Sequence, residues 1–249
     1  MSNKIRVVVW DENKQTVPTD IYPKNLRGAI ADGLNKLGNG DIVATTASLD
    51  DPNQGITAES LANADVLIWW GHARHGEVLD ETAEIVKNAV HNDGLGFLPL
   101  HSAHYSKAFK AVLGANGHLK GGWRENENPA DTEELTVAAP KHPIAAGIDD
   151  FVIDKEEMYG APFDVPPYKT VIFQSYFPLG GEYFPSFATS VGKGIDLRFT
   201  SGGGNGQNQG EGAGRVFYFR PGHETYPTYN LPIVQKVIYN GVLWLARKS

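Results

Sequence analysis

The stretch Val66–His75 (VLIWWGHARH) decides the fold of this chain. Its first five residues are all apolar, which is typical of a strand that is buried on both faces of a parallel sheet. Gly71 ends the strand, and a histidine pair, His72 and His75, follows at once. We therefore predict that imidazole side chains stand at the carboxyl end of a central strand.

The same pattern occurs twice more. The apolar run Phe97–Leu100 precedes a second pair, His101 and His104, and the run Val216–Phe219 precedes His223. The carboxyl ends of parallel strands lie at one edge of a sheet, and this edge is where α/β folds bind ligands. Five of the eight histidines are therefore predicted to gather at this edge.

Apolar strands alternate with helical periodicity along the first half of the chain. Strands are predicted at 5–10, 42–46, 66–70 and 97–100, and helices at 26–37, 79–90 and 107–113. The second half is less regular, with strands at 135–139, 170–173 and 216–219, a surface loop at 202–214 and a final helix at 231–245. This pattern predicts one α/β domain over residues 1–249, with a doubly wound, mostly parallel sheet and irregular β and loop insertions in its second half.

The composition excludes several classes of function. A net charge of −7 argues against a nucleic-acid partner. The absence of cysteine excludes disulfides and thiolate chemistry. The chain has no apolar run of the roughly 20 residues that cross a membrane, and no Gly-x-Gly-x-x-Gly or Walker loop, so no nucleotide cofactor is expected. No signal segment opens the sequence, so a cytoplasmic protein is expected, and homo-oligomerisation is left open.

Histidine is the commonest metal ligand, and without cysteine a metal here would need histidine and carboxylate ligands. The candidate ligands are His72, His75, His101, His104 and His223. Residues three apart meet only if the chain turns between them, so either member of a pair could instead be an ordinary loop histidine. Zinc is the first choice for a nitrogen-rich site, with manganese, iron and nickel left open.

Two carboxylates could move protons beside such a site. Glu224 adjoins His223, and Glu157 ends the acidic pair Glu156-Glu157, so the predicted catalytic residues are Glu157, Glu224 and His223. Most glutamates are solvated surface residues, which is the alternative for both. Ser102 lacks the glycines of a Gly-x-Ser-x-Gly elbow, so serine-hydrolase chemistry is not expected.

Aromatic side chains in loops could stack on the C–H face of a sugar ring. The candidates for substrate binding are Trp123, Tyr159 and Tyr226. A place in the core is the alternative for each of them.

Together these motifs resemble the trehalose-utilisation (ThuA-like) family over nearly the whole chain. The resemblance rests on Val66–His75, Leu100–Lys107 (LHSAHYSK), His142–Ile144, Glu156–Gly160 (EEMYG) and the specific Tyr218–Tyr229 (YFRPGHETYPTY). It implies a flavodoxin-like fold related to class I glutamine amidotransferases. Those enzymes carry a cysteine at an elbow after a central strand, where this chain has His101-Ser102, so thiol-based glutaminase chemistry is excluded.

The resemblance also implies a role in the metabolism of trehalose or related disaccharides, including 3-keto sugars. The family's motif histidines and carboxylates fall on the five histidines, Glu157 and Glu224 named above. The first hypothesis is a metal-dependent enzyme that hydrolyses or isomerises a sugar. The alternatives are a metal-free carbohydrate-binding or regulatory module, and a metal-free hydrolase that uses histidine and glutamate.

Overall fold

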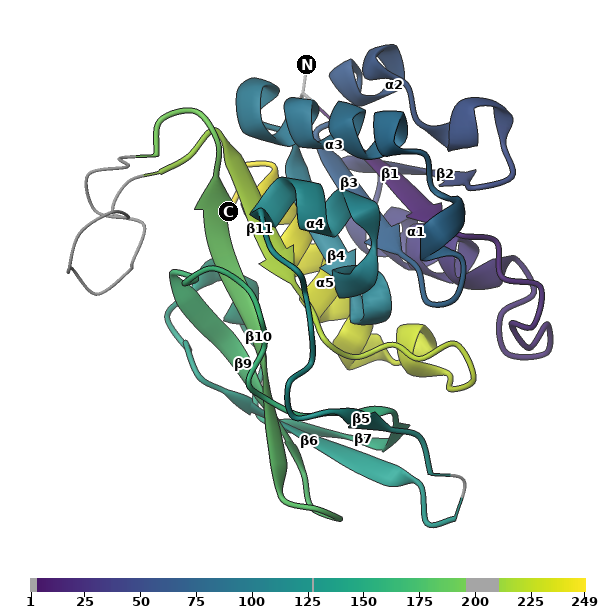
Figure 1. Ribbon diagram of the computed structural model, residues 1–249, viewed down its shortest axis with the longest axis vertical. Coiled ribbons are helices and arrows are strands. Elements are labelled where there is room, and N and C mark those ends of the chain that lie inside the picture. Colours follow the sequence, from purple (N-terminus) through teal and green to yellow (C-terminus); the bar gives the residue numbers. More distant parts are fainter. Residues whose placement is uncertain (1–3, 127, 196–210) are drawn as a thin grey trace.

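The computed structural model describes residues 4–126, 128–195 and 211–249 (Figure 1). A nine-stranded sheet runs through this part of the chain in the order β2-β1-β3-β4-β11-β10-β9-β6-β7. Its strands are β1 (Ile5–Asp11), β2 (Ile42–Ser48), β3 (Val66–Trp70), β4 (Gly96–Leu100), β6 (Asp131–Val137), β7 (Phe151–Glu156), β9 (Thr170–Phe177), β10 (Glu182–Val191) and β11 (Gly214–Tyr218). A small second sheet pairs β5 (Trp123–Arg124) with β8 (Met158–Tyr159).

The strands β2, β1, β3, β4 and β11 are parallel to one another, and we call them the parallel half. Numbered along the chain, their spatial order is 2-1-3-4-5, which is the order of the flavodoxin-like doubly wound fold. The predicted fold class is confirmed.

Helices cover both faces of the parallel half, as Figure 1 shows. The helices α1 (Asn25–Gly38) and α5 (Pro232–Leu245) pack on one face, and α2 (Ala58–Ala62), α3 (Asp80–Asp93) and α4 (Lys107–Leu113) cover the other. Short 3-10 turns are η1 (Pro52–Gly55), η2 (His75–Glu77), η3 (His101–Tyr105), η4 (Pro143–Ala145) and η6 (Thr228–Asn230). Because a helix layer lies against each face, every residue of β3 and β4 is buried, which explains their continuous apolar runs.

The strands β10, β9, β6 and β7 continue the sheet beyond β11 with antiparallel pairing, and we call them the antiparallel extension. In Figure 1 they reach down and away from the helices. The ten-residue strand β10 was not predicted, in part because Pro185 interrupts its apolar pattern. Its pairing with β11 runs only from Phe187 to Val191, so Pro185 lies where that neighbour demands no N–H.

The glycine-rich segment predicted as a loop at 202–214 falls mostly outside the described residues. Its last residue, Gly214, begins β11. None of the helices in the described ranges is long and apolar enough to span a membrane.

Candidate functional site

Three of the five candidate histidines come together at the carboxyl edge of the parallel half. His72 follows β3, His101 follows β4 and His223 follows β11. Each can offer one ring nitrogen, and these nitrogens lie within 4.8 Å of one another. The arrangement follows from the topology, because β3, β4 and β11 are neighbouring parallel strands whose ends share one edge. We call His72, His101 and His223 the histidine group.

The backbone of His101 turns sharply as it leaves β4. Its φ of +51° lies in the left-handed region, which residues other than glycine rarely adopt. Two hydrogen bonds fix this turn: His101 N donates to Phe219 O (2.9 Å), and the Tyr218 hydroxyl donates to His101 O (2.9 Å). Strain of this kind concentrates at functional sites, where surrounding contacts maintain it.

The hydrogen bond of its inner nitrogen sets the tautomer of His101. Its Nδ1 lies 3.2 Å from the carbonyl oxygen of Arg220, which can only accept, so Nδ1 carries the hydrogen and Nε2 keeps a lone pair. Complete burial lowers the pKa of His101 well below its ordinary value, so the ring stays neutral. Nε2 is then the nitrogen that can accept, and the Tyr159 hydroxyl lies 3.1 Å from it.

The Nδ1 atoms of the other two rings also have outer partners. His72 Nδ1 lies 2.7 Å from Glu224 Oε2, and His223 Nδ1 lies 2.7 Å from the hydroxyl oxygen of Thr225. Metal-bound histidines characteristically engage their second nitrogen with a carboxylate, a carbonyl or another polar group, which orients the ring. All three rings of the histidine group show this outer contact.

Glu157 faces the histidine group with a carboxylate oxygen that accepts no hydrogen bond from the described residues. This atom, Oε2, is buried and lies 3.0 Å from Nε2 of His101. A lone pair and a carboxylate oxygen at that separation repel each other unless a cation lies between or beside them. A proton or a metal ion would satisfy both atoms. Burial raises the pKa of Glu157, which favours proton uptake when no metal is bound.

Glu224 is buried like Glu157, but its surroundings are different. Burial would raise its pKa, but the hydrogen bond with His72 and the ammonium of Lys14 hold the pKa below its ordinary value. For His72, burial would lower the pKa, and the bond to Glu224 instead raises it. Glu224 is therefore an ionised partner that orients His72, whereas Glu157 is the carboxyl group suited to exchange a proton.

Arg220, Glu133 and Glu156 form a fully buried charge cluster next to the site. Arg220 Nε donates to Glu133 Oε1 at 2.8 Å, and a guanidinium nitrogen lies 3.3 Å from Glu156 Oε2. Arg220 also donates to the backbone carbonyl of Glu157 at 2.5 Å, and Glu156 accepts from the backbone N–H of His223 at 3.0 Å. The cluster thus fixes the chain at both Glu157 and His223.

The sequence did not predict the structural roles of Arg220 and Glu133. It also did not predict that of Glu12, which fixes another part of the chain around the site. The Glu12 carboxylate accepts from the backbone N–H groups of Ala73 (2.7 Å) and Arg74 (2.8 Å), so it shapes the loop that carries His72. An acidic residue directly after the first strand was a usable signal for Glu12. Nothing in the spacing of Glu133 linked it to the site.

His75 and His104 lie outside the histidine group. Tyr159 separates His104 from His101, with ring centroids 5.3 Å and 5.0 Å from the two imidazoles. His104 Nδ1 lies 2.6 Å from the carbonyl oxygen of Gly117. Burial lowers the pKa of His75 to about 4 and that of His104 to about 3, so both rings are neutral at pH 7. His104 is a buried residue, whereas His75 is only partly buried.

The three aromatic candidates have different surroundings. Tyr159 is buried and stacked on His101, and its hydroxyl lies 2.5 Å from Ser102 Oγ and 3.1 Å from His101 Nε2. The Tyr226 ring lies 5.6 Å from that of His223. Trp123 is 64 % exposed on β5, the strand that pairs with β8.

Several solved structures match this chain, and two of them cover nearly all of it. A protein assigned as a GMP synthase subunit from Thermoplasma acidophilum is 14 % identical, with 99 % of this chain and 96 % of that chain covered and a TM-score of 0.48. The glutaminase domain of Trypanosoma brucei CTPS with bound acivicin is 8 % identical, with 99 % and 95 % covered and a TM-score of 0.49. A search of curated proteins found no match.

The comparison with protein families agrees with the resemblance seen in the motifs. The model of the ThuA family, described as trehalose utilisation, matches residues 6–245. This range contains every residue of the histidine group and both carboxylates that face it. The chain belongs to the ThuA, trehalose-utilisation, family.

Proposed function

We propose that this protein is a metal-dependent enzyme that acts on a sugar during the utilisation of trehalose or a related disaccharide. The match to the trehalose-utilisation family supports a sugar as the substrate. The proposed metal binding rests on the geometry of the histidine group. Its three ring nitrogens lie within 4.8 Å of one another, and each Nδ1 atom contacts a polar group outside the histidine group.

The donor set suits a divalent ion. His72, His101 and His223 would hold it, and zinc is the first choice because it takes three histidines and leaves a position for water or substrate. The buried and unsatisfied Oε2 of Glu157 fits the same interpretation. When bound, the ion would polarise a sugar oxygen or activate a water molecule.

Glu157 and Glu224 have different roles in this proposal. Glu157, whose pKa is raised by burial, accepts and returns a proton at its Oε2 atom, beside the histidine group. Glu224, held ionised by His72 and Lys14, keeps the His72 ring in place. Hydrolysis and keto-sugar isomerisation both need such a proton carrier, and product analysis distinguishes them.

Metal analysis of protein purified without a histidine tag tests the proposal. We expect about one ion per chain in the wild type and a large loss of metal in His223→Ala. His118→Ala is the matched control, because His118 is exposed and lies outside the histidine group, and it should keep its metal. If the wild type contains no metal above background and its affinity for sugar is unchanged by a chelator, the protein is instead a binding module. Turnover that survives chelation would identify a metal-free hydrolase.

A further inference from the structure

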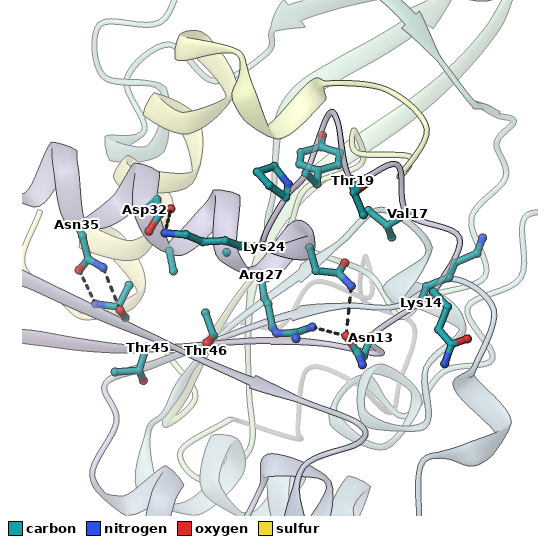
Figure 2. Close-up of a pocket in the computed structure, with 17 residues that line it drawn as sticks. Asn13, Lys14, Val17, Thr19, Lys24, Arg27, Asp32, Asn35, Thr45 and Thr46 are labelled. Carbon is teal, nitrogen blue, oxygen red and sulfur yellow. Dashed lines mark hydrogen bonds and ion pairs between the residues drawn. The ribbon is translucent and has the colours of Figure 1, made fainter.

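Two rings of the histidine group have outer contacts that continue to a second charged residue. His72 Nδ1 contacts Glu224, and Glu224 is contacted in turn by the ammonium group of Lys14. Lys14 lines a cavity of about 860 Å³ beside α1, where Figure 2 shows it. The outer contact of His223 also continues by one residue and ends at the carboxylate of Glu125. Glu125 is not among the site residues that the sequence predicts.

The chain of contacts from His223 to Glu125 passes through one hydroxyl group. His223 Nδ1 lies 2.7 Å from Thr225 Oγ1, and the Thr225 hydroxyl donates to Glu125 Oε1 at 3.3 Å. Glu125 Oε1 also lies 3.5 Å from His223 Nδ1 itself. The carboxylate therefore faces the outer nitrogen of His223 both directly and through the hydroxyl.

Glu125 follows a firmly held strand, although its own side chain is 34 % exposed. The residue before it, Arg124, donates two hydrogen bonds to Asp131, at 2.6 Å and 2.9 Å. Arg124 donates two more to Glu182, also at 2.6 Å and 2.9 Å. The strand that Arg124 ends, β5, pairs with β8 next to the histidine group. The backbone that carries Glu125 is therefore fixed close to His223.

The position of the hydrogen on the His223 ring follows from these contacts. If Nδ1 carries the hydrogen, it donates to Thr225 Oγ1, and the hydroxyl donates to Glu125, so each contact has its own hydrogen. If Nε2 carries it, the hydroxyl has one hydrogen for two acceptors, Nδ1 and Glu125. The backbone N–H of Thr225, 3.3 Å from Nδ1, favours this second arrangement. The carboxylate of Glu125 favours the first.

We propose that Glu125 is a positioning residue of the candidate site. It acts through Thr225 to hold the hydrogen of His223 on Nδ1, which leaves the lone pair of Nε2 for a divalent ion. The inference rests on the proposed function for the ion itself. Outer partners of this kind orient the ring and raise the basicity of the ligand nitrogen, and their loss typically weakens metal binding by about 10- to 100-fold.

The tautomer of His223 is the first measurement, and it needs no metal. Long-range ¹H–¹⁵N NMR spectra of the metal-free protein, with His223→Gln to assign the signals, should place the hydrogen on Nδ1. Thr225→Val removes the hydroxyl with little change of shape, and Glu125→Ala removes its acceptor, so both variants should move hydrogen to Nε2. Thr225→Ser restores the hydroxyl and should return the hydrogen to Nδ1. Both sites are exposed, so we expect these variants to fold.

The affinity for Zn²⁺ is the second measurement, made by competition with a chromophoric chelator. Glu125→Ala and Thr225→Val should each weaken Zn²⁺ binding by about tenfold, at the lower end of the usual range because solvent reaches the pair. The double variant should be no weaker than either single variant, because the two residues act through one chain of contacts. Glu134→Ala, an exposed change in β6, is the matched control and should bind Zn²⁺ as the wild type does.

The role of Glu125 and the proposed enzyme fail in different ways. The role of Glu125 is overturned if the wild-type ring carries its hydrogen on Nε2. It is also overturned, and the metal site kept, if the wild type binds Zn²⁺ and Glu125→Ala binds it equally well. A wild type that binds no Zn²⁺ overturns the metal-dependent enzyme, and a hydrogen on Nδ1 that moves in both variants then still supports the role of Glu125.

Discussion

The parallel half and the antiparallel extension contribute different parts of one site. The parallel half supplies the three imidazoles, each at the end of a strand. The extension and the chain that leaves it supply buried carboxylates: Glu133 lies in β6, Glu156 ends β7 and Glu157 follows it. Strand ends therefore position ligands through topology, whereas the groups that support them depend on contacts between distant strands.

Removing the arginine that joins the two regions should have the largest effect on stability. Arg220→Met leaves Glu133 and Glu156 buried without their cation, and breaking a buried pair in this way costs about 3–5 kcal/mol. Urea unfolding measures the loss. Arg6→Met in β1 removes a surface pair with Asp65 and should cost less than about 1 kcal/mol. Equal losses in the two variants would show that the extension does not depend on this cluster.

The second prediction concerns turnover. Glu157→Gln keeps the shape of the side chain but cannot carry a proton, so we expect activity to fall by about 100-fold or more. Thermal unfolding should stay near that of the wild type, since no charge is left without its partner. Glu134→Gln, an exposed change in β6, serves as the control and should have normal activity. Activity within twofold of the wild type in Glu157→Gln would exclude Glu157 as the proton carrier.

The pH dependence of stability should reflect the buried, neutral side chain of His104, which follows β4. Burial lowers the pKa of His104 to about 3, so below about pH 6.5 the unfolded chain binds a proton that the folded chain does not. Between these limits the group should reduce the free energy of unfolding by about 1.4 kcal/mol per pH unit as the pH falls. Urea unfolding across this range should give a shallower slope for His104→Gln than for the wild type. The exposed His118→Gln should keep the wild-type slope.

The smallest effect is expected on the surface of the parallel half. Asp50 pairs with Arg74 at 2.8 Å, and hydrogen bonds from Arg74 and Asn13 lower its pKa to about 2. The pair is exposed, so Asp50→Asn should cost less than about 1 kcal/mol at pH 7. The contribution is complete above about pH 4, the ordinary value for aspartate, and is lost as the pH falls through about 2. Thermal unfolding of both proteins at pH 7 and pH 2 measures it, and a larger gap at pH 2 would contradict this sign.

The parallel half could be predicted from local patterns. The runs at Val66–Trp70 and Phe97–Leu100 are apolar because helices cover both faces, and the histidines after them follow directly in sequence. The extension could not be predicted in the same way. Its strand β10 contains Pro185 in a position that requires no N–H on one side, a fact that depends on the register with β11.

The site, like the fold, could be predicted only in part from the sequence. The position of a residue at a strand end indicated His72, His101 and His223, but local spacing could not separate them from His75 and His104. For His104 the separation depends on Tyr159, which comes from β8 and packs against both His101 and His104. Pairing between Arg220 and Glu133 joins residues 87 positions apart, which no local pattern contains.

The left-handed backbone of His101 has a consequence for how fast a ligand can be captured. The hydrogen bonds to Phe219 and from Tyr218 hold this conformation in the folded chain before any ligand arrives. The imidazole has no search of alternative conformations left to make, so little conformational entropy is lost when an ion or substrate reaches it. A glycine at this position would adopt the same turn easily, but it would offer no ring. Association at this centre should therefore be limited by diffusion and desolvation and not by rearrangement of the loop.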